Sequence, residues 1–238
     1  MKKSKGQVTM FMIVGILLLF IVIVLFIAVK EIIKENNANV PTEMLPIKNH
    51  VDGCLEMVSS KSLSLLGLQN GISPNNPVEI DSYKFNAIYS PEDILRLDEM
   101  EGQLSEYVKA NLPDCIDGFS AFPNMQIKDG EIKVDTQINM LDVTFDIDYR
   151  IELSVGGKKH TIDEFSSTQD IRLEEIQEIM KNATEIYYSS NAIELYDYLG
   201  SLELNTTIYP VDGKKFFILE DDRSKLNNHP YKYIFALS

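Results

Sequence analysis

The chain has 238 residues, 45% of them hydrophobic, and a formal net charge of −14 at pH 7. This length allows one or two domains. Residues 1–30 hold four lysines and no acid, so residues 31–238 keep 18 basic and 36 acidic residues, a formal charge of −18. A surface this acidic disfavours nucleic acid and anionic lipid headgroups, and it suits solubility, cation binding or a basic partner.

An apolar segment without any charged residue runs from Val8 to Val29. A helix over these 22 residues would be about 33 Å long, enough to cross a hydrocarbon core of about 30 Å. The lysines before it place the N-terminus inside. We therefore predict a cytoplasmic segment at 1–7, a transmembrane helix in the lipid bilayer at 8–29, a helix extension and stalk at 30–45, and an extracytoplasmic domain at 46–238.

The N-terminus has three interpretations. A cleaved secretory signal fits poorly, because the apolar run is long and no small-x-small site follows it. Lys5-Gly6-Gln7 before the apolar run resembles the archaeal class III signal peptide, which type IV prepilin-like peptidases process. That resemblance implies cleavage between Gly6 and Gln7, although Phe11 stands where many pilins carry Glu. An ordinary uncleaved signal anchor is the alternative.

Two cysteines, Cys54 and Cys115, both belong to the outer part of the chain. In an oxidising compartment such a pair predicts a disulfide, with two free buried thiols as the alternative. The three histidines, His50, His160 and His229, show no metal-ligand spacing with each other or with the cysteines. The sequence thus predicts neither a metal site nor a cofactor.

Helical spacing predicts a helix over residues 46–68, and partial alternation predicts one or two short strands within 78–89. Ser90-Pro91-Glu92-Asp93 is a typical helix start. We expect that second helix to reach about Asn111, to divide at Gly102, and to end at Pro113. Cys115 would then lie just past it, and the disulfide would clamp the two helices together.

Strict alternation of apolar and polar residues predicts a strand over 143–155, a turn at Gly156-Gly157 and a partner strand through Ile162 and Phe165. Asp129-Gly130 predicts another hairpin within 126–134, which makes a meander of about four strands. Helices are expected over 173–187 and 192–199, and strands over 204–209, 216–219 and 231–237. This order predicts an α+β fold, with helices covering one face of an antiparallel β-meander.

Several motifs have a functional and a structural interpretation. Asn182 and Asn205 begin Asn-x-Thr triplets, which are candidates for N-glycosylation outside the cytoplasm. Asp163-Glu164 and Glu220-Asp221-Asp222 carry carboxylates of the kind that bind Ca²⁺, but solvated turns explain them more simply. A group of tyrosines either lines a binding surface or packs at the core and its rim: Tyr187, Tyr188, Tyr196, Tyr198 and Tyr209.

Three segments together resemble a group of uncharacterised single-pass surface proteins of small-genome archaea. They are Leu66–Gly71, Ser105–Cys115 and Ser224–Ala236. The resemblance extends over most of the chain. It implies a cell-surface role and an archaeal source, and it assigns no activity.

No catalytic motif is present: the sequence has no Gly-x-Ser-x-Gly, no His-Glu-x-x-His, no phosphate-binding glycine loop and no Cys-x-x-Cys. We therefore expect no catalytic residues, and a membrane-anchored surface protein that binds an unknown protein or surface partner in adhesion or envelope contact. The alternative is a type IV pilin-like filament subunit, a homo-oligomer processed after Gly6. A third option is an exported enzyme or an accessory subunit of a membrane complex.

Overall fold

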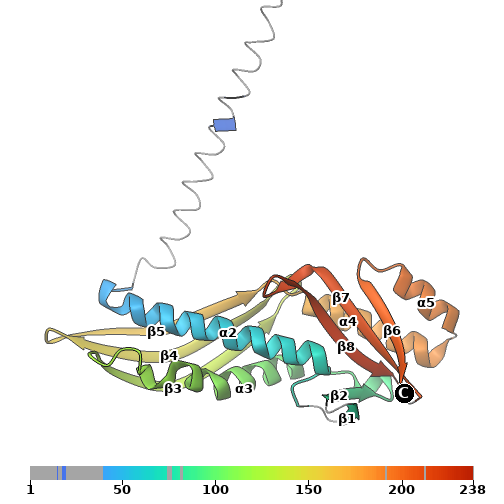
Figure 1. Ribbon diagram of the computed structural model, residues 1–238, viewed down its shortest axis with the longest axis horizontal. Coiled ribbons are helices and arrows are strands. Elements are labelled where there is room, and N and C mark those ends of the chain that lie inside the picture. Colours follow the sequence, from blue (N-terminus) through green and yellow to red (C-terminus); the bar gives the residue numbers. More distant parts are fainter. Residues whose placement is uncertain are drawn as a thin grey trace, which may run out of the picture. The chain divides into compact units, whose positions relative to one another are not determined.

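The computed structural model describes residues 40–73, 77–80, 83–190, 192–211 and 213–237, together with Gly15, Leu18 and Leu19. Apart from those three positions, the expected span at Val8–Val29 and the expected cleavage after Gly6 lie outside the described residues. Within the described part, no helix combines the length and the apolar composition needed to cross a membrane. Residues 43–238 form one compact unit (Figure 1).

Four α-helices and three short 3₁₀ turns are found among the described residues from 40 onward. The helices are α2 (Leu45–Gln69), α3 (Leu97–Ile116), α4 (Leu173–Ser189) and α5 (Ala192–Gly200), and the turns are η1 (Thr42–Met44), η2 (Pro91–Asp93) and η3 (Asp117–Phe119). The helices predicted over 46–68, 173–187 and 192–199 are confirmed to within two residues at each end.

The strands form two sheets rather than one. The three-stranded sheet has the order β3 (Gln126–Ile138), β4 (Val143–Val155), β5 (Lys158–Gln169), and the five-stranded sheet has the order β1 (Pro77–Ile80), β2 (Tyr83–Ile88), β8 (His229–Leu237), β7 (Lys214–Leu226), β6 (Asn205–Val211). All neighbouring strands are antiparallel except β2 and β8, which pair in parallel. The α+β class is confirmed, but the expected single antiparallel sheet is wrong.

The hairpin expected at Asp129-Gly130 is also wrong. β3 runs without a turn from Gln126 to Ile138, and its register against β4 shifts between Asp129 and Ile132. Because β4 offers a partner along the whole strand, the chain absorbs one extra residue as a β-bulge instead of reversing. The meander therefore has three strands, and β4 matches the predicted strand over 143–155.

The second helix starts and ends later than expected. The capping box at Ser90 and Asp93 begins only the turn η2. Ile94 is then extended, since the chain must bury both Ile94 and Leu95, and α3 starts at Leu97. The predicted start at Ser90 is thus corrected.

The far end of α3 passes through the predicted stop. Pro113 lies in the last turn and is exposed, so the carbonyl that loses its amide donor lies at the surface, where water can bond it. The helix also runs unbroken through Gly102. Cys115 is consequently part of α3, not just past it.

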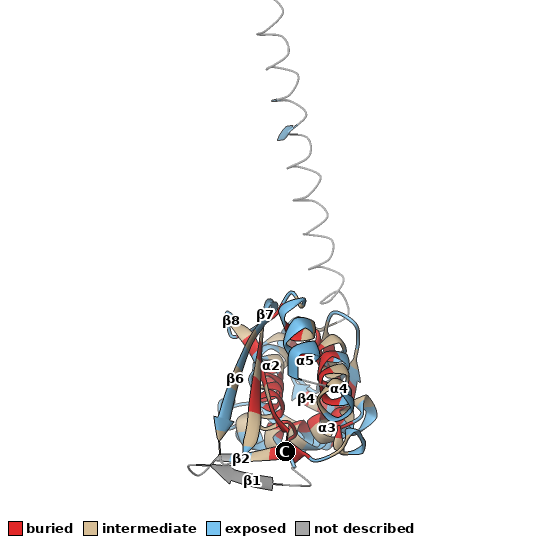
Figure 2. Ribbon diagram, turned by 90° about the vertical axis from the view of Figure 1, so that its right-hand side faces the viewer, coloured by how far each residue is buried: buried red, intermediate tan, exposed pale blue. Residues whose placement is uncertain are grey.

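The helix α2 is the central element, because it packs against α3, β2, β5 and β8. Small residues let both sheets come close: Ser59, Ser60 and Ser62 are buried on it. At Gly67, a Cβ atom would lie 2.4 Å from the carbonyl oxygen of Lys232 in β8, so only glycine fits. In Figure 2 buried residues are seen on α2 and on α4.

A buried ion pair joins the end of the three-stranded sheet to the five-stranded sheet. Arg172, between β5 and α4, donates Nε and Nη2 to the Asp221 carboxylate of β7 at 3.1 and 2.6 Å. The two side chains are 9% and 1% exposed. Burial raises the pKa of Asp221, but hydrogen bonds from Arg172, Ser224 and the Arg223 backbone outweigh it and lower this pKa below its ordinary value. We call Arg172, Asp221 and Ser224 the joint.

Candidate functional site

The bulge in β3 opens a hollow of about 320 Å³ between the end of α3 and the strands β3 and β4. We call it the bulge hollow. Its lining residues are Lys109, Pro113, Ile116, Gly118, Asp129, Gly130, Glu131, Ile132 and Tyr149. Ile116, Ile132 and Tyr149 are buried and form an apolar floor, and the charged side chains lie at the rim. An apolar floor with a few convergent polar groups is the usual composition of a binding site.

A hydrogen bond links the floor of the hollow to its rim, between the buried phenol of Tyr149 and the exposed carboxylate of Asp129. The Tyr149 hydroxyl donates to Oδ2 of Asp129 at 2.7 Å, and Tyr149 is 2% exposed. Burial raises the pKa of Tyr149, and the hydrogen bond to Asp129 and its negative charge raise it further. The phenol therefore keeps its proton at neutral pH and acts as a donor.

The backbone at the rim is held in an unusual conformation. Asp117, Gly118 and Phe119 have φ values of 49°, 54° and 60°. Such a φ is costly for a bulky residue, about 1–3 kcal/mol, and persists only where packing holds it. Phe119 is buried, and its ring stacks on Tyr149 with centroids 6.4 Å apart. The same packing thus fixes both the rim and the phenol below it.

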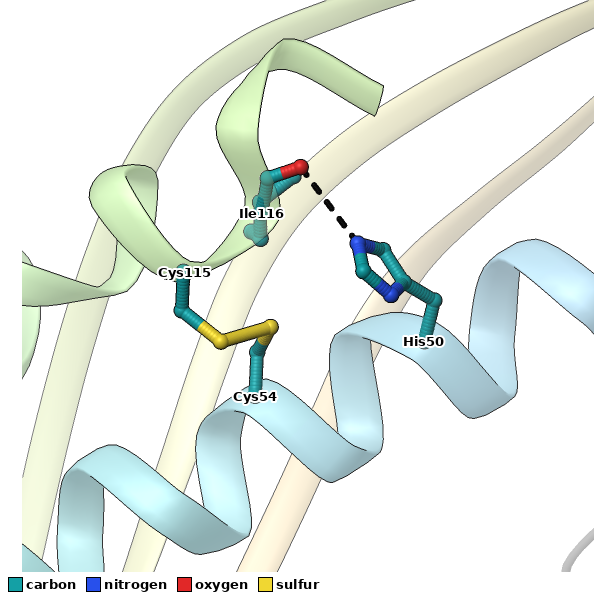
Figure 3. The surroundings of a disulfide bond; sticks show 4 residues. All are labelled: His50, Cys54, Cys115 and Ile116. Atoms are coloured by element: carbon teal, nitrogen blue, oxygen red, sulfur yellow. Dashed lines mark hydrogen bonds between the residues drawn. A yellow bond between two sulfur atoms is a disulfide. The ribbon is translucent and has the colours of Figure 1, made fainter. Parts of the chain in front are cut away.

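The disulfide anchors this region to α2. Cys54 and Cys115 are bonded, with Cα atoms 5.6 Å apart, so the predicted pairing is confirmed. One helical turn before Cys54, Nε2 of His50 lies 3.3 Å from the carbonyl oxygen of Ile116, a lining residue of the hollow (Figure 3). The position of the α3 end therefore depends directly on the disulfide.

The chemistry available in the bulge hollow is that of binding. Asp129 and Glu131 are acceptors at the rim, and Glu131 lies 3.7 Å from Lys109 in an exposed ion pair. Such an exposed pair contributes little and exchanges readily with another cation. The hollow thus offers rim carboxylates to a hydrogen-bonding or cationic group, and the Tyr149 phenol holds one of them, that of Asp129, in place.

A second groove of about 440 Å³ lies between α2 and the β7–β8 hairpin. Its lining includes Ser64 and Leu68 of α2, and Asn227 and His229 near the hairpin turn. The phenol in this groove, Tyr231, donates its hydroxyl to the Leu63 carbonyl at 2.9 Å and so ties β8 to α2. We consider the bulge hollow the better candidate, because its phenol contacts a rim carboxylate instead of the backbone.

The two glycosylation candidates differ in exposure. Asn182 is half-buried within α4, and Thr184 of its triplet is fully buried. Asn205 begins β6, and both Asn205 and Thr207 are exposed. The sequence pattern is the same at both positions, so this difference comes from the fold alone.

The structure also places the carboxylates considered for Ca²⁺ binding and the group of tyrosines. Asp221 is committed to the joint, and Glu164 lies opposite Asp148 on the outer face of the three-stranded sheet. No group of three or more His, Cys, Asp or Glu side chains is arranged for a metal ion among the described residues. Tyr188, Tyr196 and Tyr209 are exposed. Tyr187 and Tyr198 are half-buried, so the five tyrosines lie at the rim of the core or outside it.

Sequence reasoning missed Tyr149 and Asp129 as functional candidates. Tyr149 counted as one apolar member of an alternating strand, and Asp129 counted as a turn residue. The usable signal was the interruption at Asp129-Gly130-Glu131 inside a strand, since β-bulges often lie next to binding sites.

Comparison with known proteins gives no relative for this chain: no family model, no curated protein and no solved structure matches it.

Proposed function

We propose that the chain is a membrane-anchored, extracytoplasmic surface protein that binds a partner without catalysing a reaction. The observation that carries this proposal is the disulfide between Cys54 and Cys115. Disulfides persist in oxidising compartments and are rare in reducing ones. The charge-free segment from Val8 to Val29 supplies the anchor, and the resemblance to archaeal surface proteins supports the same placement.

The binding site in this proposal is the bulge hollow, and the partner presents a cationic group. Residues 31–238 carry a formal charge of −18, so a basic partner is attracted at long range. At short range Asp129 and Glu131 supply carboxylates, and the proton of Tyr149 holds the Asp129 carboxylate in place. The disulfide fixes the rim, which lowers the cost of ordering the site on binding.

Membrane topology is tested by protease treatment of intact cells that express the full chain with a C-terminal tag. Exposure of the outer domain predicts that the protease removes the tag, while a cytoplasmic marker protein survives. A tag that stays protected until the cells are permeabilised would place the domain inside and refute the proposal.

The binding site is tested with the full chain in detergent micelles and the peptide acetyl-Gly-Lys-Gly-amide, by saturation-transfer NMR. We expect transfer to the lysine peptide and not to its ε-acetylated form. Asp129→Asn should weaken binding about fivefold, since a charge-assisted hydrogen bond is lost. Asp146→Asn is the matched control, because Asp146 is an exposed carboxylate of the neighbouring strand β4 outside the hollow. Equal effects of both variants would reject the bulge hollow as the site.

The filament alternative has a weaker structural basis. Pilin helices usually run on from the apolar segment into the head domain. Here Val40 and Pro41 are not helical, η1 follows, and α2 starts anew at Leu45 with Pro46 in its first turn. Electron microscopy of the detergent-free protein separates the two functions, because ordered filaments would favour the pilin-like subunit over the dispersed binding protein.

A further inference from the structure

The fold treats the two Asn-x-Thr triplets in opposite ways. In α4, Thr184 is fully buried and its hydroxyl donates to the Met180 carbonyl at 2.7 Å, so the triplet is folded into the helix. In β6, Asn205 and Thr207 are exposed and lie on extended backbone. The side-chain amide of Asn205 donates a hydrogen bond to Oδ2 of exposed Asp222 at 3.2 Å.

In the described part of the chain, the strand β6 also has an unpaired edge that could pair with a strand of another chain. It is the last strand in the order of the five-stranded sheet, so one of its edges faces no other strand among the described residues. The run from Asn205 to Tyr209 has no charged residue, and β-branched residues dominate it. An uncharged strand edge of this kind pairs readily with other chains, and proteins usually block it with charges, proline or a covering group. Pro210 blocks only the far end.

We propose that Asn205, and not Asn182, carries an N-linked glycan that covers this edge of the sheet. This inference rests on the proposed function, because glycan transfer requires the domain to lie outside the cytoplasm. Nδ2 of Asn205 attacks C1 of a lipid-linked oligosaccharide phosphate. The C1–N bond forms, the C1–O bond to the phosphate breaks, the lipid phosphate leaves, and one amide proton passes to a base of the transferase. The remaining amide hydrogen can still reach Asp222.

The test uses cell-free translation of the full chain with microsomes that contain an oligosaccharyltransferase. The wild-type chain should gain the mass of one glycan, which an endoglycosidase removes. Asn205→Gln and Thr207→Ala should each abolish this gain, and Thr184→Ala should leave it unchanged. The control chain combines Asn205→Gln with Leu141→Thr, which creates a new triplet at Asn139 in the exposed β3–β4 turn.

The control separates the two ways of failing. If the control chain is glycosylated but the wild-type gain survives Asn205→Gln, the domain is outside and the assignment to Asn205 is overturned. If the control chain is not glycosylated, the domain does not reach the lumen, and both the topology and the glycan are rejected. The covering role is tested by sedimentation in micelles. Asn205→Gln should associate more than the glycosylated wild-type chain and more than Asn205→Gln with Thr207→Lys, which adds a charge at the edge. Equal association of the three chains would overturn the covering role.

Discussion

The two sheets of this domain are stabilised in different ways. In the three-stranded sheet, β4 alternates between buried and exposed residues, so one face packs on helices and the other faces water. In the five-stranded sheet, the consecutive residues Phe216 and Phe217 of β7 are both buried. The reason is a second apolar cluster on that sheet, in which Ala87, Phe216 and Ala236 are buried.

This difference shows what each sheet demands of the sequence. The three-stranded sheet pairs only strands that follow one another in the chain, so local turns and alternation define it. The five-stranded sheet joins residues 77–88 to residues 205–237 and includes a parallel pair, which no local pattern specifies. The joint and α2 are the elements that make one domain of the two sheets.

The largest expected effect comes from cutting the joint. Arg172→Met leaves the Asp221 carboxylate buried without its partner, which should lower the free energy of unfolding by about 3–5 kcal/mol. Urea unfolding followed by circular dichroism measures it. The double variant Arg172→Met with Asp221→Leu should recover most of the loss, since no charge stays buried. A single variant as stable as wild type would mean that the joint does not hold the sheets together.

Removing the disulfide should act mainly on the three-stranded half. Cys54→Ala with Cys115→Ala opens a loop with a sequence separation of 61 residues and should cost about 2–4 kcal/mol. Hydrogen exchange should show lost protection at the end of α3 and at the β3 bulge, and little change in β7 and β8. Reduced wild-type protein is the control and should behave alike. Uniform loss of protection across both sheets would contradict this division.

Much of the fold follows from the sequence because its signals are local. The helix α2, the strand β4, the turn at Gly156-Gly157 and the disulfide were all predicted. Three features could not be predicted from the sequence, because they depend on residues that are distant along the chain. Gly67 matters only because β8 crosses α2 there, Asp221 is bonded by Arg172 from 49 positions away, and the bulge hollow exists only once α3 packs on β3.

High pH should destabilise the five-stranded half through two buried phenols of β8. Burial raises the pKa of both Tyr231 and Tyr233 above the ordinary value of 10.0. As the pH rises above 10, these phenols ionise first in the unfolded chain. Ionisation lowers the free energy of the unfolded state, so the free energy of unfolding falls. Below pH 10 both states keep the protons, and the stabilisation is fully present.

The variant Tyr233→Phe isolates one of these phenols. At neutral pH it should lose about 1 kcal/mol, because the hydroxyl no longer donates to Asn70. Above pH 10 its stability should fall less steeply than that of wild type, as urea unfolding at a series of pH values can show. Parallel curves for the two proteins would mean that Tyr233 ionises alike in both states.

The smallest effect concerns the wet face of the three-stranded sheet. Glu164 of β5 lies directly opposite Asp148 of β4. In the described structure the Asp148 carboxylate has an ion pair with Lys133, whose Nζ lies 3.6 Å from Oδ2 of Asp148. Like charges opposite each other destabilise a sheet, so Glu164→Lys should raise the free energy of unfolding by about 0.5 kcal/mol.

Part of any gain in stability would come simply from lowering the strong negative charge of the domain. Glu106→Lys changes the charge equally at an exposed position of α3 with no strand opposite, so it measures that general part. A gain at Glu164 that exceeds the gain at Glu106 and shrinks in high salt assigns the difference to the cross-strand pair, whereas equal gains would leave net charge as the whole cause.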